Sequence, residues 1–406
     1  MRQKKVKEVL LIGIMIVICM VTAGCWDARE LQERGFVLAV GIDTANSGDL
    51  SSKSAEMRKA ETFVQHKGNK TYRMSLQILK LSAGGGGGES GGQKNESKTF
   101  ILSNTGQSLF EMDRDMLGQS SKGLFFEHIQ TIVISEAAVK EAGISVITDF
   151  LRRDPEMRWR NKVLITPGEA REILEYKSPT GEPSGQFLSN IVGLHKRNLH
   201  LPGARTDLGF VTQHLDNKLD FILPRVVKAG EVVKVGGAAV FKKDKFAGYI
   251  DEKAVAGSRF IHGTAESGII TVECKEHPGQ LLAFELFNHD IRVRPHADGD
   301  NVYFVMDMMM RGNLAEVTCS GEHDTTDLKY LRDAEEAFAD EIKRLVLYSH
   351  QTSQDMGVDF NRLGSKLKAS DRKAWERVKD RWDDIFPTVP LIVSVNVSIR
   401  NIGEHK

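Results

Sequence analysis

The sequence has few cysteines and no surplus of either charge. Its 406 residues include only four cysteines, too few for a disulfide-dense scaffold. Basic and acidic residues number 55 each, so no basic excess drives binding to nucleic acid, and we expect no nucleic-acid partner. With 41% hydrophobic and 27% charged residues the composition is that of a folded protein, and the length suggests two or three domains.

Long hydrophobic runs are also scarce, which excludes a polytopic transporter. The one candidate is residues 9–20, an uncharged run that follows four basic residues within the first seven positions. A basic start followed by a short apolar run is typical of a secretory signal peptide. A membrane-spanning helix needs about 20 apolar residues, and this run weakens before Asp27. A plain N-terminal membrane anchor is the alternative interpretation.

Cys25 stands at the end of this segment, directly after Ala23 and Gly24. Small residues before a cysteine form a lipobox, in which the thiol takes a diacylglyceryl group, the chain is cut before it, and the new amino group is acylated. Thr22 occupies the position where such boxes usually carry Leu. The pattern predicts a lipoprotein signal peptide at residues 1–24 and a weakly acidic mature body. That body would be held by lipid on the extracytoplasmic face of the membrane.

The first half of the chain shows strand and helix patterns in mixed order. We expect strands at residues 36–43, 72–79, 99–102, 129–134 and 163–165, and helices at 106–117, 135–154, 187–194 and 208–215. We expect a further helix that begins with a capping box at Thr166. Pro167 would take the first helical position, and Glu169 stands three residues after the cap.

The second half turns to β structure followed by helices. A hairpin is expected at 238–250, strands at 269–274, 281–287, 291–293, 302–310 and 314–319, a helix at 328–349 and a strand at 391–399. Trp375, Val378, Trp382 and Ile385 predict one continuous helix that begins at Ser370. The pattern predicts an α+β, multi-domain fold, with mixed and antiparallel sheets and helices packed on them.

Composition shifts suggest where the domains divide. We expect an N-terminal domain at 25–205, a connecting segment at 206–235 and a C-terminal domain at 236–404. Gly-rich loops can cradle phosphate where a strand meets a helix. However, the glycine-rich stretch at 83–92 lacks the Lys-Ser/Thr of a phosphate loop, which favours a flexible linker.

Catalytic motifs are missing from the sequence. It contains no His-Glu-x-x-His, Gly-x-Ser-x-Gly, phosphate-loop or Cys-x-x-Cys pattern. Ser365 and Lys368 have the spacing of a serine nucleophile and its amine, but no companion motif occurs, so a chance match is favoured. Four residues that could suggest a metal site lie close together in sequence: His289, His296, Asp298 and Asp300. Their spacing matches no calcium loop, so a solvated turn is favoured. We therefore expect no enzymatic activity, no metal and no cofactor. A wall-degrading enzyme would also need a paired acid and base.

Three further groups of residues leave two interpretations open. Cys274 and Cys319 each share a strand face with apolar residues, so they could form a disulfide or remain buried thiols. Trp375 and Trp382 could be core residues or a docking stripe. The basic residues around Trp159 could form an interaction face or complete a helix end; they are Arg152, Arg153, Arg158 and Arg160.

Several stretches, taken in order, resemble the Ger(x)C family of spore-germination lipoproteins. They are GCWD at 24–27 with EL at 30–31, LFFEH at 124–128, DFLRRDPEMR at 149–158, AVFKKDK at 239–245, WERVK at 375–379 with Trp382, and the final strand up to Gly403. Residues 353–357 depart from the Asp-Ile-Phe-Gly-like turn that is usual in the family.

The resemblance implies the C subunit of a nutrient germinant receptor. Such a subunit is anchored through acylated Cys25 to membrane lipid on the outer face of the spore inner membrane. Its partners would be the A and B subunits of the receptor, and its fold would be α+β in several small domains. The rival hypothesis is an extracytoplasmic solute-binding lipoprotein that captures the nutrient directly, which would need two α/β lobes and a cleft.

Overall fold

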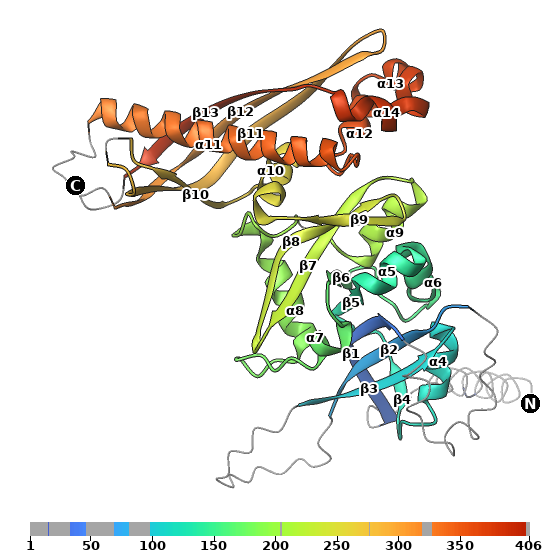
Figure 1. Cartoon of the computed structure of the whole chain (residues 1–406). Coiled ribbons are helices and arrows are strands. Elements are labelled where there is room, and N and C mark those ends of the chain that lie inside the picture. Colours follow the sequence, from blue (N-terminus) through green and yellow to red (C-terminus); the bar gives the residue numbers. More distant parts are fainter. Residues whose placement is uncertain are drawn as a thin grey trace, which may run out of the picture.

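The computed structural model describes residues 15, 33–45, 69–80, 98–203, 205–275, 277–318 and 327–402. The signal peptide expected at 1–24, apart from residue 15, and the glycine-rich stretch lie outside these residues. The described chain forms one nine-stranded and one four-stranded sheet, each with helices packed on it (Figure 1). The predicted α+β class with mixed sheets is therefore confirmed.

The larger sheet is parallel at its centre and antiparallel at both ends. Its order is β3-β2-β1-β5-β6-β7-β8-β9, and the short β4 pairs with β1. Strands β1, β5, β6 and β7 run parallel to one another. The strands are β1 (Arg34–Thr44), β2 (Tyr72–Leu79), β3 (Thr99–Gly106), β4 (Gly123–Phe125), β5 (Thr131–Ser135), β6 (Lys162–Thr166), β7 (Phe221–Ala229), β8 (Val232–Lys242) and β9 (Lys245–Ile250).

Helices cover both faces of this sheet and bury separate apolar clusters. One face packs against α4 (Leu109–Met116), α5 (Glu136–Ala142), α6 (Ile144–Arg153) and α9 (Leu208–Asp216). The other face packs against α7 (Ala170–Leu174) and α8 (Ser184–Gly193). Strand β5 is buried on both faces of the sheet, which explains the continuous apolar run from which this strand was predicted.

The capping box predicted at Thr166 does not form. Thr166 is the last residue of β6, α7 begins only at Ala170, and the side chain of Glu169 makes no cap hydrogen bond. Asp43 at the end of β1 takes this role instead. Its carboxylate accepts from the backbone N–H groups of Ala170 (2.6 Å) and Arg171 (3.1 Å). Tertiary contact between β1 and α7 supplies the acceptor that the local sequence was expected to supply.

Several elements were absent from the sequence prediction: β4, the helix at 363–370, β7 and α10 (Glu252–His262). Strand β7 contains Pro224, which lowers the strand signal, and the pairing of β7 with β8 shifts register just after that proline. Helix α10 follows the hairpin, with Asp251 as its N-cap and Gly263 in the left-handed region at its C-terminal end. Residues 206–235, expected as a connecting segment, contain α9, β7 and the start of β8, which belong to the layers of the larger sheet.

The second sheet has the order β10-β11-β12-β13. Its strands are β10 (Gly268–Glu273), β11 (Leu281–Asp298), β12 (Asn301–Val317) and β13 (Leu391–Asn401). The separate strands predicted within 281–293 and within 302–319 are in fact one long hairpin. The β11–β12 ladder runs on through the polar residues between the predicted pieces, and its register shifts at 283–284 and 286–288.

The long helix α11 (Leu328–Asp355) covers one face of this sheet, as Figure 1 shows in orange. Phe338 and Ile342 are fully buried there, and the ring of Phe338 lies 5.2 Å from that of Phe284 on β11. The same face of β12 contributes Met306, Met308 and Met310, all 2% exposed or less. The alternation of buried and exposed positions along β12 thus places its apolar side chains under the helix.

The continuous helix predicted from Ser370 is interrupted. Ser370 is the last residue of α12 (Leu363–Ser370), and the predicted range contains α13 (Arg372–Val378) and α14 (Trp382–Ile385). Asp371 adopts an extended conformation and caps α13 through the backbone N–H of Ala374 (2.9 Å), so the helix restarts there. Trp382 is 6% exposed and its ring meets that of Trp375 edge-on at 5.6 Å. Trp382 is therefore a core residue.

The molecule has two halves, one built on the larger sheet and one built on the smaller sheet. Helix α10 joins them by packing against α11. Gly257 makes this approach possible, because a Cβ at this position would lie 2.0 Å from the carbonyl oxygen of Leu345 and 2.6 Å from the Cβ of Ser349. No side chain larger than hydrogen fits at that distance. The apolar residues of α10 consequently reach the clusters beneath both sheets.

Candidate functional site

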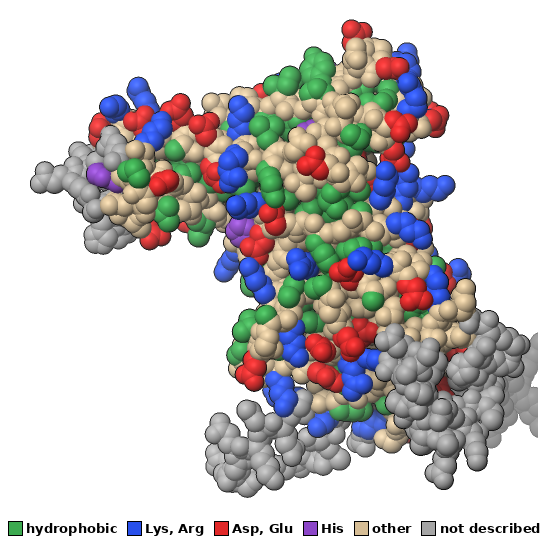
Figure 2. Space-filling model, in the orientation of Figure 1, with side chains coloured by type: hydrophobic (Ala, Val, Ile, Leu, Met, Phe, Trp, Pro, Cys, Tyr) green, Lys and Arg blue, Asp and Glu red, His purple; other side chains and the backbone are tan. Residues whose placement is uncertain are grey.

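The predicted lipid-attachment residue, Cys25, lies outside the described residues, so the lipid anchor stays a prediction. Among the residues that the structure describes, no helix has the length and apolar content needed to cross a membrane. On the face seen in Figure 2, basic and acidic side chains are interspersed.

Cys274 directly follows β10 and is 4% exposed, within the apolar cluster of the second sheet. Its backbone N–H donates to the carbonyl of Gln280 (2.8 Å). Cys319 lies outside the described residues, and the possible bridge between the two cysteines stays untested. Alkylation of the unfolded chain before and after reduction distinguishes a bridge from two free thiols.

The residues considered for chemistry do not converge. His289 and His296 lie far apart along β11, and the ring of His296 stacks on Tyr303 at 4.8 Å. Asp300 pairs instead with Arg381 (2.8 Å). Across the described ranges, no three His, Cys, Asp or Glu side chains gather to hold a metal ion. Ser365 and Lys368 lie on α12, where the serine is half-buried and the lysine is exposed.

The arginines around Trp159 form ion pairs near the end of α6. Arg153 contacts Asp149 at 2.9 Å, and Arg158 contacts Glu127 at 3.3 Å. Exposed pairs of this kind contribute about 0–1 kcal/mol each. Trp159 remains 57% exposed beside them, so both interpretations of this patch stay open.

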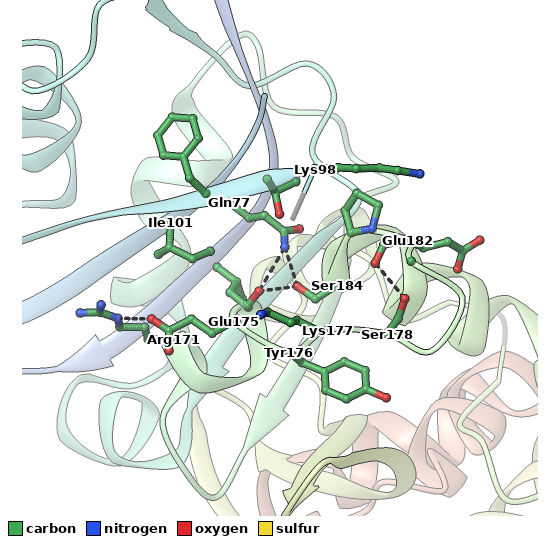
Figure 3. Close-up of a pocket in the computed structure, with 15 residues that line it drawn as sticks. Gln77, Lys98, Ile101, Arg171, Glu175, Tyr176, Lys177, Ser178, Glu182 and Ser184 are labelled. Carbon is green, nitrogen blue, oxygen red and sulfur yellow. Dashed lines mark hydrogen bonds and ion pairs between the residues drawn. The ribbon is translucent and has the colours of Figure 1, made fainter. Parts of the chain in front are cut away.

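An open cleft of about 540 Å³ lies between the edge strand β3 and the segment from α7 to α8. Figure 3 shows Gln77 of β2 directed at Ser184. The Gln77 amide donates to the carbonyl of Leu174 (3.1 Å) and to Ser184 Oγ (2.9 Å), and it accepts from the N–H of Gly185 (3.1 Å). These bonds satisfy the buried amide and fix α7 and α8 on the sheet, which indicates a structural role.

The densest polar contacts lie at the junction of the two halves, around Arg362. Its Nη1 donates to Nε2 of His214 on α9, and its Nε donates to Nε2 of His262 on α10, both at 3.3 Å. The Nδ1 atoms of these histidines donate to the carbonyls of Phe210 (2.8 Å) and Ser258 (2.9 Å). Since a carbonyl can only accept, the proton is on Nδ1, and since Arg362 can only donate, Nε2 has no proton, so each imidazole is neutral.

The environment of the two histidines favours this neutral form. Burial, with the positive charges of Arg362 and Arg205 in addition, lowers the pKa of His214 to about 4. Desolvation and Arg362 lower the pKa of His262 to about 3. Arg362 itself has a left-handed backbone (φ 55°), which is uncommon for any residue except glycine. Contacts to two helices hold it in that conformation.

A second arginine, Arg259 of α10, is 2% exposed. Its Nη1 donates to the carbonyls of His195 and Asn198, each at 2.6 Å, and its Nη2 donates to the carbonyl of Thr264. Burial lowers its pKa to about 10, so it stays charged at neutral pH. Arg259 thereby ties the segment after α8 to α10.

Two aspartates connect the same junction on its other side. Asp220 accepts from the backbone N–H groups of Lys243 and Asp359, both at 3.0 Å, and so links the β8–β9 turn to the turn before α12. Asp359 accepts from the N–H groups of Leu363 and Gly364 (2.8 Å each) and from Trp382 Nε1 (3.1 Å). Desolvation nevertheless raises the pKa of Asp359 to about 7.

Both parts of the chain match described families. Residues 27–228 match the "Spore germination protein N-terminal domain" and residues 236–403 match "Spore germination B3/ GerAC like, C-terminal". The fold and these matches together define a two-part spore germination protein. The chain belongs to the Ger(x)C family, as the sequence resemblance predicted, and its role is in spore germination.

Relatives align with the chain almost from end to end. Spore germination protein YndF of Bacillus subtilis (strain 168) is 27% identical over 97% of this chain and 97% of its own length. Spore germination protein KC of the same organism is 21% identical over 98% of this chain and 97% of its own. The crystal structure of the GerBC protein shares the fold, with a TM-score of 0.56 and 17% identity over 84% of this chain and 96% of that chain.

The junction residues have no distinguishing signal in the sequence. His214, Arg259, His262 and Arg362 carry no motif, and they are brought together only by the packing of α9, α10 and the turn before α12. One local signal was present for Asp43, a lone carboxylate that directly follows the apolar run at 36–42 of β1. Buried charges of this kind are rare without partners, so the residue could have been marked as structurally important.

Proposed function

We propose that this protein is the lipid-anchored, non-enzymatic C subunit of a nutrient germinant receptor. The observation that carries the proposal is the family match along nearly the whole chain, combined with the lipobox that ends at Cys25. Diacylglycerol on Cys25 would hold the body on the outer face of the spore inner membrane. Each buried CH₂ contributes about 0.8 kcal/mol, and two acyl chains suffice for stable anchoring.

Anchoring would serve assembly with the A and B subunits. Confinement to the membrane plane raises the effective concentration of the body near its partners. For nutrient binding to pass through this subunit, its contacts with the partners must differ between the resting and the activated receptor. The junction around Arg362 supports such a role, because one side chain there bonds to α9 and to α10.

Replacing the anchored cysteine tests the first part of the proposal. We expect the native protein to begin at Cys25 and to carry acyl groups by intact-mass analysis. Cys25→Ala should lack the acyl mass and should slow the germination response of the spores. Cys19→Ala is the matched control, because it makes the same change inside the segment that is to be removed, and it should behave as the wild type.

An uncleaved start at Met1 without acyl groups would contradict the anchor. Co-purification tests the second part: we expect a tagged chain, extracted from spore membranes with detergent, to bring down the A and B subunits of one receptor. A chain that purifies alone under conditions in which A and B stay together would contradict the assignment as a receptor subunit.

A further inference from the structure

A cavity of about 330 Å³ opens at the junction of the two halves. Its walls come from the segment before α9, from α9 and the start of β7, from α10, and from the turn at residues 360–362. It therefore lies between residues matched by the N-terminal family and residues matched by the C-terminal family. Ligand sites are frequent at such boundaries.

The lining of this cavity is divided into an apolar part and a cationic part. Rings and an aliphatic chain form the apolar part, namely Phe210, Phe221, Ile222 and Phe360. The guanidinium groups of Arg205, Arg259 and Arg362 form the cationic part, and the lining residues include no aspartate or glutamate. Both lining histidines are neutral, because Nδ1 of each donates to a carbonyl while Nε2 accepts from Arg362.

Two carboxylates act on the lining arginines, Glu266 on Arg259 and Asp359 on Arg362, and both have other partners. Glu266, which faces Arg259, pairs with Lys196 at 3.3 Å. Asp359, which faces Arg362, accepts three hydrogen bonds from Leu363, Gly364 and Trp382. The positive charge of the cavity is consequently not cancelled at the lining itself.

Two buried polar atoms in the lining have no protein partner. Arg259 Nε and Thr206 Oγ1 make no hydrogen bond within the described chain, although the two residues are only 2% and 1% exposed. Because both atoms are themselves buried from solvent, they lie behind the surface of the cavity. Arg205, in contrast, is exposed at the entrance, and no hydrogen bond or ion pair of its guanidinium occurs in the described residues.

We propose that this cavity binds a small carboxylic acid with an apolar body. The carboxylate accepts from the exposed guanidinium of Arg205, with the buried positive charges of Arg259 and Arg362 nearby, and the body packs against Phe210 and Phe360. Charge-assisted hydrogen bonds to arginine are the strong ones, and arginine matches the planar geometry of a carboxylate. The volume lies at the lower end for ligand pockets, which limits the ligand to a small acid. This inference does not rest on the proposed receptor role.

Calorimetric titration of the full chain in detergent tests the site. The probe is 4-methylpentanoate, compared with its neutral amide, 4-methylpentanamide, and with inorganic phosphate. We expect the acid to bind and the amide and phosphate to bind at least tenfold more weakly. Arg205→Gln should weaken binding of the acid about tenfold, because one charge-assisted contact is lost. Arg197→Gln is the matched control, since it removes an exposed arginine outside the cavity lining.

Each remaining outcome overturns a stated part of the inference. If 4-methylpentanoate does not bind to the wild type, the cavity is not a site for this class of acid. Equal binding of acid and amide would remove the role of the arginines, and equal binding of phosphate would remove the role of the apolar wall. Equal loss in Arg197→Gln would show that the effect is one of overall charge. Unchanged thermal unfolding of Arg205→Gln establishes that the variant is folded.

Discussion

Replacement of Gly257 by alanine probes the contact that holds the two halves together. The new Cβ would lie 2.0 Å from the carbonyl oxygen of Leu345, so α10 and α11 must separate by about 1 Å to restore normal contact. Overpacking costs about 1–3 kcal/mol, and the upper end applies because the opposing atom belongs to the backbone. The better helix propensity of alanine returns about 1 kcal/mol. We expect a net loss of about 1–2 kcal/mol in the free energy of unfolding.

Urea unfolding of the full chain in detergent measures this loss, followed by the fluorescence of the tryptophans near α11. With a slope of about 2 kcal/mol per M, the midpoint should fall by roughly 0.5–1 M. Gly193→Ala in α8 is the control, because a Cβ there meets no atom within 4 Å, and its midpoint should stay unchanged or rise slightly. A Gly257→Ala midpoint equal to that of the control would refute the close approach of the two helices.

Three further predictions concern the buried polar groups. Asp43→Ala should lose about 1–2 kcal/mol of unfolding free energy in urea, because two N–H groups of α7 lose their acceptor, while Glu169→Ala should lose less. Folding lowers the pKa of His214 to about 4. The neutral imidazole therefore contributes about 3 kcal/mol to the free energy of unfolding above its unfolded pKa, and this contribution is lost as the pH falls towards 4. His214→Gln should flatten this acid loss, and an unchanged slope between pH 7 and 4.5 would contradict the neutral imidazole. Folding raises the pKa of Asp359 to about 7. The contribution of the protonated carboxyl group to the free energy of unfolding is therefore complete below pH 3.8 and is lost as the pH rises through 7. Asp359→Asn should remove that loss in unfolding measured from pH 4 to 8, and retention of the full slope would contradict it.

Local patterns predicted most of the strands and the helices with their own caps. Ser135 caps α5 through the N–H of Ala138, and β2 and α9 lie where the alternation and the helical spacing placed them. Two of the errors arose where a distant residue or a shift of register decides the local structure. Helix α7 begins where Asp43 reaches it, and β7 tolerates Pro224 because the ladder shifts register there. Neither effect is encoded within a short window of sequence.

The junction could not be predicted for the same reason. Its cavity draws on segments from residue 202 to residue 362, and only the folded chain brings them into contact. Arg362 looks like an ordinary surface arginine in sequence, yet it takes a left-handed backbone and bonds to two imidazoles. The family resemblance identified the protein, while the chemistry of this site depends on tertiary packing.

The position of β13 has a consequence for how the polypeptide acquires its shape during synthesis. Strand β13 pairs in parallel with β12, although the whole of α11 and the three short helices separate them along the chain. A ribosome delivers the N-terminal part first, so the larger sheet can complete itself while translation continues. The smaller sheet must wait for β13 to emerge. A product that stops before Leu391 therefore presents the long edge of β12 to other chains and would be prone to aggregate.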